Sequence, residues 1–258
     1  MSAGERWRTS LEAWTIPEAI LTQAEENPWI LPAALFQIPA IISTTPSHER
    51  ARAALRVESS VLDVGCGGGA AAFALLPEVK RVFGVDRQRQ MLAMFEANAR
   101  DRGLVVETVE GLWPEVALRT PVADVVTAHH VVYNVSDVVP FLRALDEHAR
   151  ARVVIEMTTR HPLTSLNEAW MHFWDLERPS GPTSDDLIEV MDEMGLSVSK
   201  ERFEGTTWSE SSLDEAANFA RIRLCLPVSR EGEVRDFLRR HPAPTSRSLV
   251  TLWWDQRS

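Results

Sequence analysis

Several residue types are scarce in this sequence of 258 residues, and each scarcity excludes a class of protein. Cysteine occurs only at Cys66 and Cys225, which gives neither a disulfide framework nor the spacing of a metal-binding motif. No apolar run is long enough to span a bilayer, and the first residues lack the apolar core of a secretion signal. We therefore expect a cytoplasmic protein with no membrane contact and no bound metal.

Lysine is equally rare. Lys80 and Lys200 are the only lysines among 27 basic residues, and the formal net charge of the chain is −10. Proteins that bind nucleic acid normally carry a clustered basic face, which neutralises the phosphates. The sequence has no basic run, so we expect no nucleic-acid partner. Hydrophobic residues make up 45% of the chain, which is enough for a single large domain over residues 1–258.

One stretch has the pattern of a nucleotide-binding corner. Residues 61–75 begin as a short apolar strand, pass through a turn that contains Gly65 and Gly67, and continue into alanine-rich sequence of helical character. The following helix directs its free N–H groups at a ligand on the turn. The spacing from Gly65 to Ala70 also matches the G-x-G-x-x-A fingerprint of dinucleotide binders. An NAD-dependent oxidoreductase is therefore one interpretation.

A carboxylate before the turn favours a different ligand. Asp63 stands two residues before Gly65, where a dinucleotide fingerprint normally keeps an apolar residue. The order from Asp63 through Gly65 and Gly67 resembles motif I of the class I S-adenosylmethionine-dependent methyltransferases, especially the members that methylate menaquinone, ubiquinone and other small molecules. In that family the turn holds the methionine part of the cofactor, whose ammonium and sulfonium groups are cationic. The resemblance implies that Asp63, Gly65, Cys66 and Gly67 contact S-adenosylmethionine.

Later segments extend the resemblance. A strand over residues 81–86 ends in Asp86, at a spacing from Gly65 that suits a carboxylate for ribose hydroxyls. The helix that opens next is similar to the family's Asp-x-Ser-x-x-Met-Leu pattern. Many members then carry an acidic residue near the adenine, but Leu112 stands at that position, so we expect backbone groups and the face of Trp113 to hold the ring. The alternative is that Trp113 belongs to the core. The cofactor contacts implied for this region are Asp86, Arg87, Met91, Gly111, Leu112 and Trp113.

Two histidines follow the fourth strand, which we expect over residues 123–128. Residues 123–137 are similar to the motif IV region of the menaquinone and ubiquinone C-methyltransferases, whose residues lie beside the transferred methyl group. Methyl transfer needs a base only where the acceptor carries a proton. We expect His130 to accept that proton, and His129 to pack against the methionine part of the cofactor. The alternative is that both histidines only shape the pocket.

Strand and helix alternate up to residue 157, which predicts an α/β fold with helices on both faces of a mostly parallel sheet. The resemblance implies the Rossmann-like, seven-stranded sheet of the class I methyltransferases, with an antiparallel last strand. We divide the single domain into a helical N-terminal arm (1–46), a cofactor-binding core (47–157) and two cap insertions (158–182 and 206–248). The arm either folds over the mouth of the cofactor site or packs outside the sheet. A helix over residues 47–55, capped by Ser47, leads into the first strand.

The insertions indicate the kind of acceptor. Open α/β sheets bind ligands in the loops at the carboxyl ends of their parallel strands. Trp170 and Trp174 stand one helical turn apart, and we expect these two and Tyr133 to contact a small hydrophobic or aromatic molecule. The alternative for Tyr133 is that it only caps the sheet. Arg221 and Arg223 either meet an anionic acceptor or lie on a solvated helix face. The sequence thus predicts an S-adenosylmethionine-dependent methyltransferase, with a catalytically silent S-adenosylmethionine-binding protein as the alternative.

Overall fold

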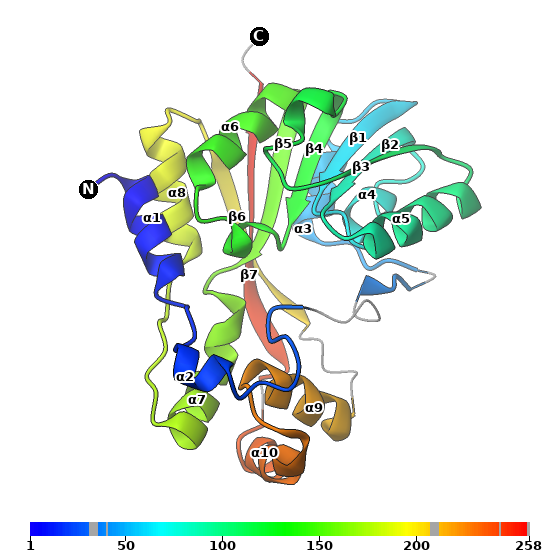
Figure 1. The fold of residues 1–258 in the computed structure, drawn as a ribbon. Helices are drawn as coiled ribbons and strands as arrows, with labels where there is room; N and C mark the ends of the chain where they lie inside the picture. The colour runs from blue at the N-terminus through cyan, green and yellow to red at the C-terminus, as the bar shows by residue number, and fades with distance from the viewer. Residues whose placement is uncertain (31–35, 40, 207–211, 243, 257–258) are drawn as a thin grey trace.

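The computed structural model describes residues 1–30, 36–39, 41–206, 212–242 and 244–256. Within these residues, strand pairing joins seven strands into one sheet (Figure 1). The strands are β1 (Ser59–Val64), β2 (Val79–Asp86), β3 (Val105–Glu110), β4 (Ala123–His129), β5 (Ala149–Thr158), β6 (Ser199–Thr206) and β7 (Ser246–Asp255). Their order is β3-β2-β1-β4-β5-β7-β6, with β1 to β5 parallel and β7 antiparallel to both β5 and β6. The predicted fold class is confirmed, including the antiparallel last strand.

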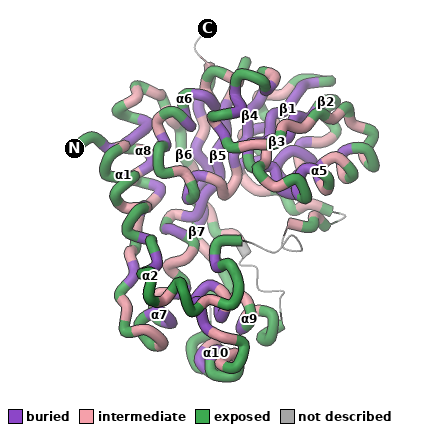
Figure 2. The backbone as a smooth tube through the Cα atoms, viewed as in Figure 1, coloured by how far each residue is buried: buried purple, intermediate pink, exposed green. Residues whose placement is uncertain are grey.

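Helices cover both faces of the sheet. One face packs against α3 (Pro46–Arg52), α4 (Ala70–Phe73) and α5 (Arg89–Asp101), and the other against α1 (Ala3–Glu12), α6 (Val138–His148) and α8 (Ser184–Glu193). Successive strand residues alternate between the two cores: Val61 and Leu62 are both fully buried, but on opposite faces. Burial on both faces explains why the central parallel strands β1 and β4 carry apolar residues on both faces, and Figure 2 shows buried residues concentrated along the middle of the sheet.

A smaller helical lobe lies at the carboxyl edge of the parallel strands (Figure 1). It contains α2 (Glu18–Leu21), α7 (Asn167–Trp174), α9 (Leu213–Arg223) and α10 (Glu231–Arg240). These helices share a separate hydrophobic core, to which Ile16, Trp170, Leu224 and Phe237 contribute. The helical lobe therefore joins part of the N-terminal arm to both sequence insertions. Short 3-10 helices occur at η2 (Ala117–Arg119), η3 (Val132–Asn134), η4 (Pro162–Leu166) and η5 (Val228–Arg230).

The N-terminal arm contacts three parts of the molecule. Its first helix, α1, packs outside the sheet against α6 and α8, where the indole N–H of Trp7 donates to the carbonyl of Val135 over 2.8 Å. Its second helix belongs to the helical lobe, and Phe36 then lies against the turn that follows β1. Each sequence alternative for the arm thus describes one part of it. Two apolar residues of the predicted arm, Leu31 and Leu35, lie outside the described residues.

The helix that leads into β1 begins earlier than predicted. It starts at Pro46, and Thr45 rather than Ser47 is its N-cap. Proline suits the first turn because it lacks an N–H that would have no partner there. Ser47 is fully buried instead, and its hydroxyl accepts a hydrogen bond from Thr251 on β7. Among the residues described, no helix has the length and apolar character needed to cross a membrane.

Candidate active site

The glycine turn between β1 and α4 needs glycine for both conformation and space. Gly65, Gly67 and Gly69 have φ angles of 71°, 49° and 96°, in the region that side-chain-bearing residues rarely adopt. A Cβ atom on Gly65 would lie 2.5 Å from Cγ2 of Val131, and one on Gly68 would lie 2.0 Å from the carbonyl oxygen of Phe36. Gly65 itself is exposed, so its backbone is the part of the turn that a ligand can approach.

Asp63 lies behind this turn and not on its surface. The residue is 1% exposed, and its Oδ1 accepts a hydrogen bond from the hydroxyl of Thr127 over 3.0 Å. Its Oδ2 is buried without a hydrogen-bond partner among the described residues. Burial raises the pKa of Asp63 to about 7. Asp63 thus supports the turn from the sheet, and its contact with a cofactor stays a prediction.

Asp86 connects the end of β2 to the turn. Its Oδ2 accepts a hydrogen bond from the N–H of Gly67 over 3.2 Å, and its Oδ1 accepts one from the N–H of Gln88 over 2.9 Å. The residue is half-buried, and its oxygens keep lone pairs for hydroxyl groups. Gly111 donates its N–H to the carbonyl of Asp86 over 3.0 Å, which brings the start of the next loop to the same edge.

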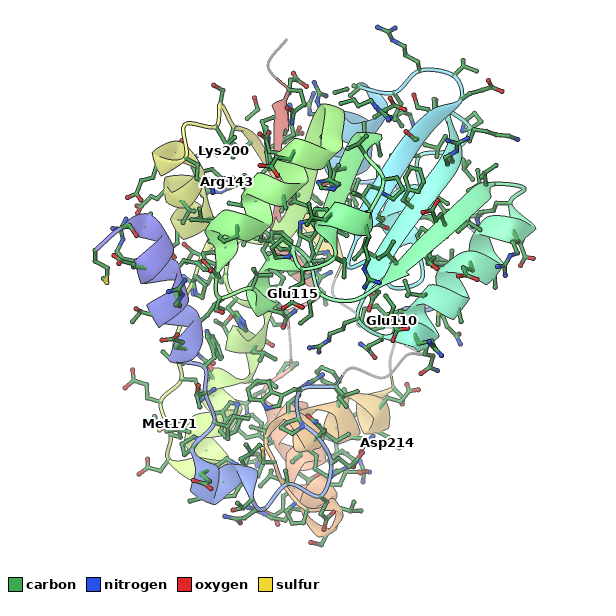
Figure 3. The ribbon with its side chains drawn as sticks, turned by 45° about the horizontal axis from the view of Figure 1, so that its top comes forward. Glu110, Glu115, Arg143, Met171, Lys200 and Asp214 are labelled. Carbon is green, nitrogen blue, oxygen red and sulfur yellow. The ribbon has the colours of Figure 1, made fainter. Side chains whose placement is uncertain are left out.

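The exposed residues around this edge come from the ends of β2 and β3. Arg87 is exposed, and Leu112, at the expected adenine position, is 50% exposed. Figure 3 shows Glu110 and Glu115 on the sheet side of the molecule, and Asp214 and Met171 on the helical lobe. The predicted cofactor residues on these two loops therefore lie at the sheet edge that faces the lobe.

Three residues predicted to contact the cofactor are buried instead. The indole of Trp113 is 8% exposed, donates its N–H to the carbonyl of Phe141 over 3.2 Å, and meets the ring of His148 edge-on. The ring of Trp113 is therefore part of the core, as in the second of the two sequence interpretations, and its contact with adenine stays a prediction. Met91 and Cys66 are 1% and 6% exposed, and burial raises the pKa of the Cys66 thiol.

The carboxyl ends of β4 and β5 carry a cluster of ionisable groups. His130 Nε2 lies 3.1 Å from Oε1 of Glu156. The other carboxylate oxygen of Glu156 accepts a hydrogen bond from the hydroxyl of Thr45 over 2.7 Å. The backbone N–H of Thr45 donates to Nδ1 of His48 over 3.0 Å, and the rings of His48 and His129 are 5.4 Å apart. The arm, α3 and two strands thus meet at one point.

The two predicted histidines have different environments. The Nε2 atom of His129 is buried with no partner among the described residues, and burial lowers the pKa of this histidine to about 3. His129 is therefore neutral at neutral pH. The side chain of His130 is 31% exposed, and its backbone has a φ of 58°. A left-handed histidine at the end of a strand is uncommon and is typical of functional sites.

Sequence reasoning missed Glu156. It is 5% exposed, although it stands within the apolar run of β5. Burial by itself raises the pKa of a carboxylate, but hydrogen bonds from His130 and Thr45 and the nearby His129 hold the pKa of Glu156 below its ordinary value. The available signal was a single charged residue in a strand that is buried on both faces. Its register partner on β4 is His129.

The residues predicted to contact the acceptor lie mostly inside the protein. Tyr133 is 7% exposed, its hydroxyl lies 2.8 Å from Oγ1 of Thr158, and burial raises its pKa to about 12. Trp170 is 3% exposed in the core of the helical lobe. Trp174 is half-buried and donates its indole N–H to the carbonyl of Leu224 over 2.7 Å. The predicted acceptor contacts of Tyr133 and Trp170 therefore stay predictions, made for side chains that are buried in this structure.

The arginines of α9 are neither solvated nor at the sheet edge. Arg221 is 2% exposed and forms ion pairs with Glu26 and Glu231. Arg223 is 7% exposed and donates to the carbonyl of Ile30 over 3.3 Å. The solvated-face interpretation is wrong because these side chains fill the interior of the helical lobe. No cluster of three or more His, Cys, Asp or Glu side chains in the described ranges has an arrangement that can hold a metal ion.

Part of the chain matches a known family. Residues 62–152 match the sequence model of a family described as a methyltransferase domain. The chain is 28% identical over 139 residues to the uncharacterized methyltransferase YcgJ of Bacillus subtilis (strain 168), covering 52% of this chain and 54% of YcgJ. It is 30% identical over 109 residues to the ubiquinone biosynthesis O-methyltransferase of Aeromonas salmonicida (strain A449), covering 41% and 46% of the two chains. The chain thus spans about half the length of the curated relatives it matches.

Solved structures share the fold. The crystal structure of YcgJ from Bacillus subtilis has a TM-score of 0.57 at 19% identity, over 82% of this chain and 98% of that chain. The magnesium protoporphyrin IX methyltransferase of Synechocystis PCC 6803, solved with bound SAH, has a TM-score of 0.50 at 14% identity, over 87% and 91% of the two chains. At these identities the likeness is one of fold.

Proposed function

We propose that this chain, whose core belongs to the class I S-adenosylmethionine-dependent methyltransferases, transfers a methyl group from that cofactor to a small, hydrophobic or aromatic acceptor. The observation that carries the proposal is the corner formed by the glycine turn and Asp86. There the backbone of Gly65 is exposed, and Asp86 is fixed beside it by the N–H of Gly67. Such a corner gives a ligand a backbone surface with a carboxylate at its edge.

The residues of the corner fit S-adenosylmethionine better than a dinucleotide. The carboxylate of Asp86 beside the turn makes the local potential negative, and Asp63 behind the turn adds to it only in its ionised fraction, because burial raises its pKa to about 7. A negative potential favours the cationic ammonium and sulfonium groups and opposes a pyrophosphate. Gly65, Gly67, Asp86 and Gly111 are the residues proposed to hold the cofactor, with Leu112 and Arg87 at the exposed edge.

His130 is the residue proposed to remove a proton from the acceptor. Its side chain is partly exposed, whereas His129 is buried and neutral and only shapes the site. When bound, S-adenosylmethionine supplies a methyl group on a sulfonium sulfur, and in-line displacement turns this sulfonium into a neutral thioether, which is the leaving group. The chain has to hold the acceptor in contact, exclude water and take up one proton. One matched relative is named an O-methyltransferase, which supports oxygen as the acceptor atom.

The helical lobe is the part proposed to cap the acceptor site. It lies at the carboxyl edge of the parallel strands, and its core helices come from the arm and from residues 158–182 and 206–248. Buried arginines and tryptophans build this lobe, so its surface toward the sheet, and not its interior, selects the acceptor. A lobe that closes over this edge would exclude water from the transfer.

A transfer assay separates an active methyltransferase from a catalytically silent binding protein. The purified chain is incubated with S-adenosylmethionine that carries a tritiated methyl group and with a panel of small phenols, each beside its methyl ether. We expect label in the phenols and none in the ethers, and we expect His130→Gln to reduce the rate at least hundredfold. Tight cofactor binding without transfer to any compound of the panel favours the silent protein.

A further inference from the structure

We infer that Glu156 is a positioning residue for the proposed transfer, because it fixes His130 in the tautomer whose Nδ1 takes the proton of a hydroxyl-bearing acceptor. This inference rests on the proposed function and assigns a role to a residue that the sequence motifs leave out. Glu156 is 5% exposed, so it acts through His130 and not on the acceptor itself.

The geometry ties His130 to Glu156 at two points. The backbone N–H of His130 donates to the carbonyl of Glu156 over 2.8 Å, and the ring Nε2 lies 3.1 Å from Oε1 of the same residue. These two contacts hold the backbone of His130 in the left-handed region, at a φ of 58°. Residues other than glycine keep this conformation only where their surroundings impose it. The imidazole is therefore held in one orientation at the end of β4.

The charge of Glu156 determines which ring nitrogen of His130 carries the proton. An ionised carboxylate only accepts hydrogen bonds, so the 3.1 Å approach of Nε2 of His130 to Oε1 favours the tautomer with its N–H at Nε2. A neutral imidazole with its proton on Nε2 has its lone pair on Nδ1. Nδ1 is thus the basic atom, and the partly exposed ring can present it to an acceptor.

Residues outside β4 and β5 hold the carboxylate in place. The hydroxyl of Thr45 donates to Oε2 of Glu156 over 2.7 Å, so both carboxylate oxygens are occupied. The backbone N–H of Thr45 is fixed in turn by Nδ1 of His48, which is 5% exposed. His129, the register partner of Glu156 on β4, flanks the carboxylate from the neighbouring strand. The N-terminal arm therefore completes the site.

The proposed step balances with the groups present. The oxygen of the acceptor forms its bond to the methyl carbon while its proton passes to Nδ1 of His130. The electron pair of the broken carbon–sulfur bond stays on the departing sulfur. The resulting imidazolium remains paired with Glu156 through Nε2 and releases its added proton from Nδ1 to water. A hydroxyl acceptor needs this proton transfer, whereas an acceptor without a proton on its reacting atom does not.

The tautomer of His130 tests the inference without a known acceptor. Long-range proton–nitrogen correlation spectra of protein with ¹⁵N-labelled histidine report which ring nitrogen carries hydrogen, and His130→Gln assigns the signals. At a pH where the ring is neutral, we expect more than nine-tenths of His130 to carry its proton on Nε2. A preference for Nδ1–H in the wild-type protein overturns the inference, whatever the variants do.

Two variants and a control establish that Glu156 causes the preference. Glu156→Leu removes the acceptor for Nε2, so we expect a mixture of tautomers, and Glu156→Gln is expected to restore part of the preference through its side-chain oxygen. Glu201→Gln is the control, because Glu201 pairs with Arg50 of α3 near the same site but does not touch His130. Equal Nε2–H populations in the wild type and in whichever Glu156 variant folds would overturn the role of Glu156.

Calorimetric titration of the same samples with S-adenosylhomocysteine distinguishes this inference from the proposed function. Binding by wild-type protein together with the wrong tautomer overturns the inference and leaves the proposed function standing. Absence of binding by wild-type protein overturns both, because the inference rests on the proposed function. Binding that stays within threefold of wild type in the folded Glu156 variant, with the tautomer preference lost, supports both.

Discussion

Replacing Asp63 by asparagine should stabilise the protein increasingly as the pH rises. The carboxylate is 1% exposed, and burial raises its pKa from the ordinary value of 3.8 to about 7. Below pH 3.8 both the folded and the unfolded chain are protonated at this position, so burial carries no penalty. Above that pH the unfolded chain releases the proton first, and the free energy of unfolding falls until the folded chain releases it too, near pH 7.

The size of the effect follows from the pKa difference. Between pH 5 and pH 6 the wild-type protein should lose about 1.4 kcal/mol of stability per pH unit relative to the asparagine variant, and this slope halves at pH 7. The difference between the two proteins should therefore grow by roughly 2 kcal/mol from pH 5 to pH 7 and level off at higher pH. Any constant cost of the amide, such as a weaker bond to Thr127, shifts the whole curve without changing its slope.

Urea unfolding at pH 5, 6, 7 and 8, followed by tryptophan fluorescence, measures this difference. Asp124→Asn is the control. Burial alone would raise the pKa of Asp124, but hydrogen bonds from Ser60 lower it below its usual value, and Asp124 is therefore ionised in both states above pH 5. Its substitution should cost the same free energy across the series. A pH-independent difference for Asp63→Asn, or one that shrinks as the pH rises, would refute the assignment of a buried, poorly compensated carboxylate.

Three further substitutions test the packing around the site. Gly68→Ala should destabilise the fold by about 1–3 kcal/mol, since the new Cβ would lie 2.0 Å from the carbonyl oxygen of Phe36; an unchanged melting temperature contradicts this contact. Tyr133→Phe should cost about 1 kcal/mol in urea unfolding because the backbone N–H and the hydroxyl of Thr158 lose the Tyr133 oxygen as a partner, and a stabilised variant would contradict these bonds. Arg221→Ala should cost about 1–3 kcal/mol because it leaves the buried carbonyl of Leu226 without its donor and removes the cation that pairs with Glu26 and Glu231; neutrality in thermal unfolding would contradict these contacts.

The sequence predicted the sheet and the glycine turn after β1 because both depend on local patterns. Continuous apolar runs marked strands buried on both faces, and glycine spacing marked the turn after β1. The start of α3 was misplaced by one residue: Ser47 matched the composition of a helix cap, but the adjacent Thr45 with Pro46 satisfies the helix end better. Local propensity alone does not decide between two neighbouring caps.

The functional side chains were harder to predict because burial decides their roles. Trp113 and Tyr133 have the chemistry of ligand contacts, but Trp113 is packed in the core and Tyr133 bonds a neighbouring strand. Glu156 was missed for the opposite reason, since its partners His130 and Thr45 are far away in sequence and meet only through strand pairing and the path of the arm. The spacing of residues in the sequence predicts where a side chain stands on a helix or strand. It does not predict which side chains from other strands or from the arm will contact it.

The central claim is that the corner at β1 and β2 holds an S-adenosyl compound. Two calorimetric titrations, one with S-adenosylhomocysteine and one with NAD, test this claim most directly. We predict saturable binding of S-adenosylhomocysteine, no detectable binding of NAD, and at least tenfold weaker binding, about 1.4 kcal/mol, after Asp86→Ala. Asp124→Asn, at the opposite end of the strands, should bind like the wild type. Failure of the wild-type protein to bind S-adenosylhomocysteine, or preferential binding of NAD, would contradict the account.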